Sequence, residues 1–121
     1  MAERHFRFPK SRRLILNAEF QRVRVEGSSV RGETLTLGFL KNASPFSAAR
    51  AGFVTSKRVG SAVSRNQIRR RLREIFRKHQ HELTPGIWIV TVASARAVRT
   101  SFSALEDEWL RLAHRASILA P

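Results

Sequence analysis

Cysteine is absent from this chain of 121 residues. Its absence excludes disulfides, cysteine-based zinc fingers and thiol nucleophiles together. The sequence also lacks any apolar run near the roughly 20 residues that span a bilayer. Its longest run, Ile87 to Ala93, has the length of a strand, and the first residues carry charges where a signal peptide has its apolar segment. We therefore expect a cytoplasmic protein without a membrane partner.

Acidic residues are scarce. The chain has 9 Asp plus Glu against 23 Lys plus Arg, which gives a formal net charge of +14 and a pI of about 12.0. The hydrophobic fraction of 42% is typical of a globular domain, and the length suits one domain with one modest core. Such a positive excess destabilises the folded state through self-repulsion unless a polyanion binds. Nucleic acid or an acidic protein is the expected partner.

Turn residues and apolar periodicity divide the first half of the chain. We expect residues 1–13 to form a flexible basic arm and residues 14–117 to form a single domain. A first helix is predicted with Asn17 as its N-cap, ending before Gly27 in a left-handed turn. Residues 28–31 should be a short connection with a little extended structure. Residues 34–40 and 49–56 are predicted as strands, and in the first run apolar residues alternate with Thr36 and Gly38. We expect these two strands to pair antiparallel.

The second half contains the best-defined helix. Ser64 and Gln67 form a capping-box pattern, and the helix should run to about His79. An apolar face on this helix is predicted for Ile68, Leu72, Ile75 and Phe76, with Asn66, Arg70, Arg73 and Arg77 opposite. Residues 87–93 read as a strand in a sheet interior. A third helix should begin near residues 100–103, with Ser103 and Glu106 as a capping pair and an apolar stripe of Phe102, Leu105, Trp109 and Leu112.

The segment from Lys57 to Lys78 concentrates the positive charge. It holds nine basic residues, seven of them Arg, against the single acidic residue Glu74. Like charges this close on a helix are destabilising without counter-ions, and the planar guanidinium fork suits phosphate oxygens. The segment therefore predicts a phosphate-binding surface.

The same segment carries a spaced motif: Ala62, Arg65-Asn66, Arg69-Arg70 and Leu72-Arg73. Further matches lie outside it, at Arg13-Leu14, Glu19-Phe20, Gly27 and Ala51-Gly52-Phe53-Val54. With these residues, about residues 12–113 resemble the protein component of bacterial ribonuclease P.

The resemblance implies an α+β fold, a single-domain αβββαβα sandwich whose central sheet has a left-handed βαβ crossover. It also implies a subunit of an RNA-based endoribonuclease that removes the 5′ leader of precursor tRNA. The chemistry would belong to the catalytic RNA of ribonuclease P and its Mg2+, with no catalytic residue and no metal held by this chain alone. The partners would be that RNA and precursor tRNA, with no DNA expected.

Site residues follow from the resemblance by position. The RNA contacts would be Lys57, Arg58, Arg65, Asn66, Arg69, Arg70, Arg73 and Arg77. A cleft for the leader, between the sheet and the first helix, would be lined by Phe20, Arg24 and Phe39. An exposed aromatic ring there fits base stacking.

Three residues depart from the family pattern. Gln67 stands where the family often has Arg, and Arg24 and Gly38 stand where aromatic residues are common. We therefore expect less stacking on the leader, with phosphate contacts contributing more of the affinity.

Other readings of the sequence stay open at this point. A structural RNA-binding protein of the ribosomal type would share the composition, and a protein-only nuclease would use His or carboxylates. A DNA-binding helix-turn-helix protein would need a short helix before the basic one, where Gly60 and a strand stand instead.

His79 and His81 lack a third metal ligand, and Glu106 to Glu108 point in different directions on a helix. Trp88 and Trp109 should be core residues, whereas Phe20 suits either core or cleft.

Overall fold

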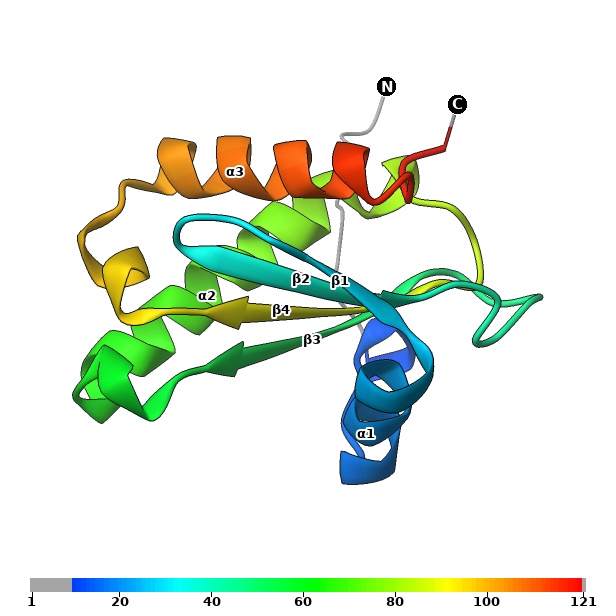
Figure 1. Cartoon of the computed structure of the whole chain (residues 1–121), viewed down its shortest axis with the longest axis horizontal. Helices are drawn as coiled ribbons and strands as arrows, with labels where there is room; N and C mark the ends of the chain where they lie inside the picture. Colours follow the sequence, from blue (N-terminus) through cyan, green and yellow to red (C-terminus); the bar gives the residue numbers. More distant parts are fainter. Residues whose placement is uncertain (1–9, 121) are drawn as a thin grey trace, which may run out of the picture.

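The computed structural model describes residues 10–120 as three α-helices and a four-stranded sheet, joined by short 3-10 turns (Figure 1). In chain order the elements are η1 (Lys10–Arg12), α1 (Asn17–Glu26), β1 (Ser28–Arg31), β2 (Leu35–Leu40), β3 (Arg50–Thr55), η2 (Lys57–Val59), α2 (Ala62–His79), η3 (Gln80–Glu82), β4 (Trp88–Ala93), η4 (Ala95–Arg99) and α3 (Phe102–Arg115). This order confirms the predicted αβββαβα arrangement. The predicted connection at residues 28–31 is in fact the strand β1.

The strands lie in the order β1-β2-β4-β3. β2 pairs antiparallel with β1 and with β4, whereas β3 pairs only with β4 and runs parallel to it. The predicted antiparallel pairing of residues 34–40 with 49–56 is therefore wrong. The apolar strand β4 takes the position between them, where its side chains are covered on both faces.

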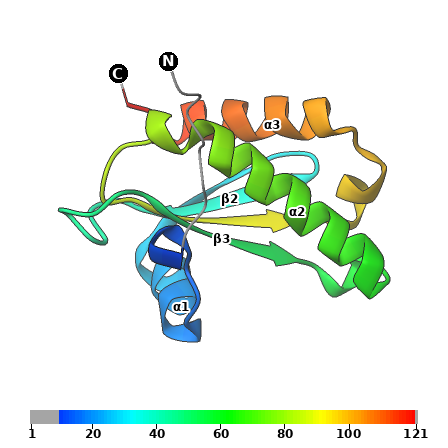
Figure 2. The ribbon, with the colours of Figure 1, turned by 180° about the vertical axis from the view of Figure 1, so that it is seen from behind.

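The connection from β3 through α2 to β4 is left-handed, as the resemblance implied. Seen from the side of α2, with both strands pointing upward, β4 lies to the left of β3 (Figure 2). Almost all parallel crossovers have the opposite hand. The consequence for the site is that α2 lies across one face of the sheet while its first turn stays beside the end of β3.

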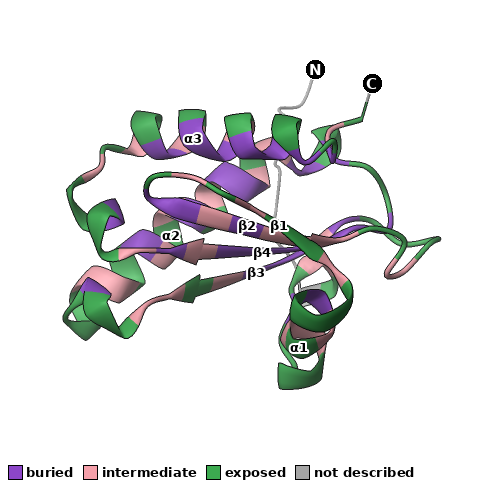
Figure 3. Cartoon of the chain, viewed as in Figure 1, coloured by how far each residue is buried: buried purple, intermediate pink, exposed green. Residues whose placement is uncertain are grey.

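The sheet separates two hydrophobic clusters. The larger lies between the sheet and the inner faces of α2 and α3, with Leu72, Ile75, Phe76 and Leu105 fully buried. The smaller lies on the other face, where Val23 of α1 packs with Leu14, Trp88 and Val90. In Figure 3 the outer face of α3 is exposed, and α1 exposes most of its surface. The predicted core faces of α2 and α3 are confirmed, and both tryptophans are buried.

All three helix starts differ from the predicted caps. Helix α1 is capped from within, because Glu19 Oε1 accepts hydrogen bonds from the N–H groups of Ile15 and Leu16 at 2.8 and 2.9 Å. At α2 and α3, Ser61 Oγ and Ser101 Oγ each accept from the N–H group three residues on, at 3.2 Å. The predicted caps Asn17, Ser64 and Ser103 lie inside their helices. The cap position belongs to Leu16 at α1, to Ser61 at α2 and to Ser101 at α3.

Gly27 ends α1 as predicted, but for a different reason. Its φ of −92° is not left-handed. A Cβ at this position would overlap the carbonyl of Phe39 and stand 2.5 Å from the Val23 oxygen. Glycine is needed here because α1 and β2 approach closely.

Part of the predicted basic arm belongs to the domain. Arg13 forms a parallel bridge with Ala51 at the outer edge of β3, and Arg12 Nη1 donates to Gln80 Oε1 at 2.9 Å. Residues 1–9, which carry the rest of the predicted arm, lie outside the described residues. Within residues 10–120, no helix is long and apolar enough to cross a membrane.

Candidate RNA-binding surface

Helix α2 has a packed side and a cationic side. Ile68 is 2% exposed and Leu72 is 0% exposed against the sheet, whereas Arg70 and Arg73 are exposed on the opposite side. Arg65 and Arg69 are partly exposed along the flank. The prediction that Arg70 and Arg73 lie opposite the apolar stripe is confirmed, so their charges face solvent without contributing to the core.

A short turn brings Lys57 and Arg58 beside the start of α2. Val59 is buried and anchors this turn, while Ser56 Oγ accepts from the Arg58 N–H at 3.2 Å. Gly60 has a φ of +113°, a conformation that L side chains rarely adopt. The glycine lets the chain reverse into α2 with both cationic side chains exposed.

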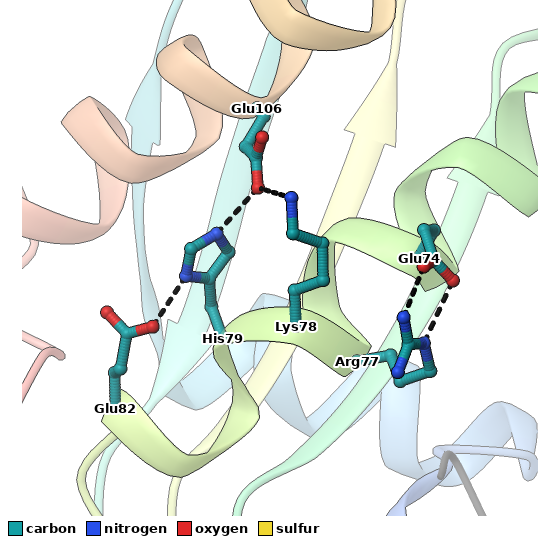
Figure 4. Close-up of polar contacts among 6 residues, drawn as sticks. All are labelled: Glu74, Arg77, Lys78, His79, Glu82 and Glu106. Atoms are coloured by element: carbon teal, nitrogen blue, oxygen red, sulfur yellow. Dashed lines mark hydrogen bonds and ion pairs between the residues drawn. The ribbon is translucent and has the colours of Figure 1, made fainter. Parts of the chain in front are cut away.

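The polar residues at the two ends of α2 are engaged differently. Near the start, Arg69 Nη2 donates to Asn66 Oδ1 at 2.6 Å, so the amide orients a guanidinium that keeps its charge uncompensated by any carboxylate among residues 10–120. Near the end, both Arg77 Nε and Nη2 bind the Glu74 carboxylate, with Nε to Oε1 at 2.9 Å (Figure 4). The hydrogen bond from Arg77 lowers the pKa of Glu74, with the Arg77 and Lys78 charges adding to the effect against burial.

The last turn of α2 is further neutralised by α3. Lys78 Nζ lies 2.8 Å from Glu106 Oε2, and His79 contacts Glu82 Oε2 and Glu106 Oε2 at 2.6 and 2.7 Å (Figure 4). The His79 ring also stacks on Trp109 with a centroid distance of 6.2 Å. Hydrogen bonds from Lys78 and His79 lower the pKa of Glu106. His79 therefore ties α2 to α3, and the strongly cationic part of α2 runs from Arg65 to Arg73.

A further cationic stretch has no signal in the sequence pattern. Arg96 and Arg99 are exposed on η4, which packs against η2 and the start of α2. Arg71 Nη1 donates to the Thr100 carbonyl at 3.2 Å, which fixes this junction. Arg96 and Arg99 therefore extend the basic surface around Lys57 and Arg58. A 3-10 segment has no periodicity that would have placed them.

A groove of about 660 Å3 lies between α1 and the sheet. Its walls include the predicted Phe20 and Arg24, and its floor includes Gly38, Val54, Val90 and Val92. Phe20 is thus a groove residue as well as a neighbour of the smaller core. The placement predicted for Phe39 is wrong. Side chains alternate along β2, so Gly38 faces the groove and Phe39 packs on the larger core beneath α2 and α3.

The groove has an apolar floor, one aromatic wall and a polar rim. Asn17, Gln21 and Arg24 line the rim, and Arg24 Nη2 donates to Gln21 Oε1. No Asp or Glu is among its lining residues in the described chain. An apolar floor beside amide and guanidinium groups suits a nucleobase and its phosphate.

The other candidate residues have structural contacts. The buried Glu108 accepts from the N–H groups of Thr34 and Leu35 at 2.9 and 2.8 Å, and Asp107 is exposed. Glu106 binds Lys78 and His79 of α2. The three carboxylates of residues 106–108 therefore point in three different directions. Across residues 10–120, no group of three His, Cys, Asp or Glu side chains is placed to hold a metal ion.

Comparisons with known proteins identify the family and agree with the fold. A family model described as Ribonuclease P matches residues 8–117. The chain belongs to the ribonuclease P protein family. It is 32% identical over 111 residues to the ribonuclease P protein component of Syntrophomonas wolfei, covering 92% of each chain. It is 35% identical over 112 residues to that of Desulfosudis oleivorans, covering 93% of this chain and 91% of the relative.

Solved structures of the family have the same fold. The RNase P protein of Staphylococcus aureus superposes with a TM-score of 0.82 at 27% identity, over 92% of this chain and 100% of that one. The RNase P protein from Thermotoga maritima gives a TM-score of 0.75 at 30% identity, over 85% and 96%. Membership makes this ribonuclease P protein an RNA-binding subunit of an endoribonuclease of tRNA processing, associated with the ribonuclease P RNA.

Proposed function

We propose that this chain binds the catalytic RNA of ribonuclease P through the basic surface of η2 and α2, and the 5′ leader of precursor tRNA through the groove beside α1. The observation that carries the proposal is the placement of both features around strand β3. Lys57 and Arg58 follow β3 directly, and Val54 of β3 lines the groove. One strand thus joins the two sites.

The contacts are divided by chemistry. Lys57, Arg58, Arg65, Asn66, Arg69, Arg70 and Arg73 would meet RNA phosphates, with Arg77 at the margin because Glu74 binds its guanidinium. In the groove, Phe20 would stack on a leader base and Arg24 would meet its phosphate. Among residues 10–120, Phe20 is the one aromatic residue that lines the groove, which supports the expectation that phosphate contacts contribute much of the leader affinity.

The catalytic step is proposed to lie with the RNA. Mg2+-dependent cleavage needs a metal site, but the described residues bring no three suitable ligands together, and the carboxylate on the basic face is bound to Arg77. The residues that the structure describes therefore do not fit a resident Mg2+ site, and we assign the ion to the partner RNA. The cytoplasmic location and the absence of a DNA partner stay predictions.

Binding measurements with matched RNAs test this assignment. Precursor tRNA should bind the complex of this protein with ribonuclease P RNA more tightly than mature tRNA does, and Phe20→Ala should remove most of the difference. The affinity of the protein for ribonuclease P RNA should fall roughly a thousandfold between about 50 and 200 mM salt if about six phosphate contacts form. Equal binding of the two tRNAs by the wild-type complex would reject the leader groove, and a flat salt response would reject the phosphate contacts.

A further inference from the structure

Phe46 is an aromatic side chain that the fold leaves in solvent. It lies in the loop of residues 41–49 between β2 and β3 and is 103% exposed, more than any other large apolar residue of the described chain. Within residues 10–120 its ring takes part in no aromatic pair or cation–π contact. A ring kept in water forgoes the free energy that burial supplies, so folding alone gives no reason for this placement.

The loop that carries Phe46 is held by backbone hydrogen bonds. The Ser47 N–H donates to the Ser44 carbonyl at 2.9 Å and closes a turn whose central residues are Pro45 and Phe46. Proline suits the first central position of such a turn. The Ser44 N–H donates to the Gly86 carbonyl at 3.1 Å, and the Gly86 N–H donates to the Ser47 carbonyl at 2.7 Å. The backbone that presents the ring is therefore ordered before any ligand binds.

The loop is also packed from two sides. Gly86 has a φ of +82°, and a Cβ there would stand 3.1 Å from the Ser44 oxygen and 3.2 Å from Pro45 Cα. On the other side, Ala43 packs against the smaller core, and its carbonyl accepts from Arg22 Nη1 of α1 at 3.3 Å. The turn before β4 and helix α1 thus fix the two parts of the loop that precede Phe46.

The sequence around this loop carries positive charge alone. Residues 34–73 include no Asp or Glu, and Lys41 is exposed at the start of the loop. Phosphates are attracted to such a segment, and no carboxylate of the loop, of β2 or of β3 repels them. The charge therefore favours a nucleic acid as the neighbour of Phe46.

The size of the apolar surface favours a base over a protein partner. A stable protein interface buries about 800 Å2 on each partner, whereas Phe46 is the one exposed large apolar side chain of residues 41–49. A nucleobase needs one face of the ring, and stacking of this kind contributes to affinity whatever the base. Because the loop is ordered in advance, the contact costs little conformational entropy.

Phe46 lies outside the leader groove. The groove includes Thr36 and Gly38 of β2, and Phe46 is not among its lining residues. The loop enters β3 at one end, and η2, with Lys57 and Arg58, follows the other end. In Figures 1 and 2 the loop projects from the end of the sheet opposite the start of α2. The length of β3 thus separates the ring from the basic surface.

We propose that Phe46 stacks on an unpaired base of ribonuclease P RNA. The ring is then a second attachment point for that RNA, at the far end of β3 from the basic surface. It adds a contact that does not depend on charge, unlike the phosphate contacts of α2. This inference rests on the proposed function, since it takes the RNA that binds η2 and α2 as its partner.

The test measures the affinity of the protein for ribonuclease P RNA in the absence of precursor tRNA. Phe46→Ala removes the ring, Phe46→Leu keeps an apolar side chain without a stacking face, and Phe46→Trp enlarges that face. Val25→Ala is the matched control, because Val25 of α1 is 68% exposed and does not line the leader groove. Thermal unfolding should be unchanged in all the Phe46 variants, since the ring is fully exposed.

Phe46→Trp also gives a direct signal for stacking. Trp88 and Trp109 are both buried, at 7% and 1% exposure, so the introduced indole is the exposed one. Its fluorescence should be quenched when ribonuclease P RNA is added, because a stacked base lies against the ring. The same titration of the wild-type protein gives the signal of the two buried tryptophans.

Phe46→Ala and Phe46→Leu should each weaken binding roughly tenfold, with the salt slope unchanged because no charge is removed. Phe46→Trp should bind at least as tightly as the wild type, and Val25→Ala should bind equally. Wild-type affinity in Phe46→Leu, or a loss that appears only when precursor tRNA is present, would overturn the proposed contact. If Arg70→Ala still weakens binding in that assay, the proposed function stands. If neither substitution has an effect, both fail.

Discussion

The ring of Phe20 lies directly on Gly52 of β3, and a Cβ at position 52 would stand 2.5 Å from Phe20 Cζ. No side chain larger than hydrogen fits there without moving the ring. Phe20 is also the aromatic wall of the leader groove. Gly52 therefore sets the position of the residue on which stacking depends.

Substituting Gly52 by Ala should displace Phe20 and lower the leader-dependent part of the affinity several-fold. Overpacking of this kind also costs about 1–3 kcal/mol of stability. The measurement is the ratio of precursor tRNA to mature tRNA affinity, together with chemical denaturation. Gly38→Ala is the comparison within the groove, because a Cβ at position 38 meets no atom closer than 3.6 Å and so alters the groove floor without displacing Phe20. An unchanged affinity ratio in Gly52→Ala would show that the ring position does not matter for the leader.

Arg70→Ala should weaken binding to ribonuclease P RNA without changing the unfolding midpoint. Arg70 is exposed opposite the apolar stripe of α2, so it contributes charge to the surface and nothing to the core. Loss of one phosphate contact should reduce the slope of log affinity against log salt by about one. Arg111→Ala on α3 removes the same charge away from this surface and should leave the slope unchanged. A drop in the unfolding midpoint of Arg70→Ala would contradict the orientation of the helix.

Glu74→Gln should strengthen RNA binding. The substitution removes the carboxylate that binds Nε and Nη2 of Arg77, so these two nitrogens can meet a phosphate at the margin of the basic surface. The salt slope should rise by about one. Asp107→Asn is the matched control, because it removes one exposed acidic charge from α3 instead. If both variants bind RNA equally more tightly, net charge alone explains the gain and the Glu74–Arg77 pair does not limit the surface.

Glu19 should make folding stability depend on pH in the acid range. Burial opposes its ionisation, but hydrogen bonds from the Leu16 and Ile15 N–H groups and from Arg50 outweigh that cost and lower its pKa below the ordinary value of 4.5. A carboxyl with a lowered folded-state pKa stabilises the fold above its unfolded pKa, and the contribution is lost as pH falls through the folded value.

Glu19→Gln should therefore cost about 1 kcal/mol near neutral pH, the usual worth of a helix N-terminal cap. Denaturation of both proteins between pH 7 and pH 3 checks this, and the difference should shrink as the pH drops below about 4.5. Glu33→Gln, at an exposed position in the turn before β2, should follow the wild-type curve throughout. A difference that stays constant with pH would mean that ionisation of Glu19 has no part in the cap.

Sequence patterns predicted the elements well and their pairing less well. The apolar spacing of Ile68, Leu72, Ile75 and Phe76 identified the buried face of α2, because a helix repeats every 3.6 residues whatever it packs against. Strand order has no such local signal. That β4 lies between β2 and β3 follows from the left-handed path of α2, which only the family resemblance implied.

The site was predictable where it depends on one helix and not where segments meet. The exposure of Arg70 and Arg73 followed from the helical period. Which face of the sheet each residue of β2 occupies did not, and the structure shows that Gly38 rather than Phe39 faces the groove. The bridge from Arg13 to Ala51 joins residues 38 positions apart, and no local pattern predicts it. Contacts between residues so far apart in sequence appear only in the folded chain.

Cleavage of a precursor tRNA at low Mg2+ tests the central claim most directly. The reaction is run with this protein alone, with ribonuclease P RNA alone and with both, and the 5′ end of the product is mapped. The account predicts correct removal of the leader only in the combined reaction. Equal cleavage by the RNA with and without the protein, or cleavage by the protein alone, would contradict it.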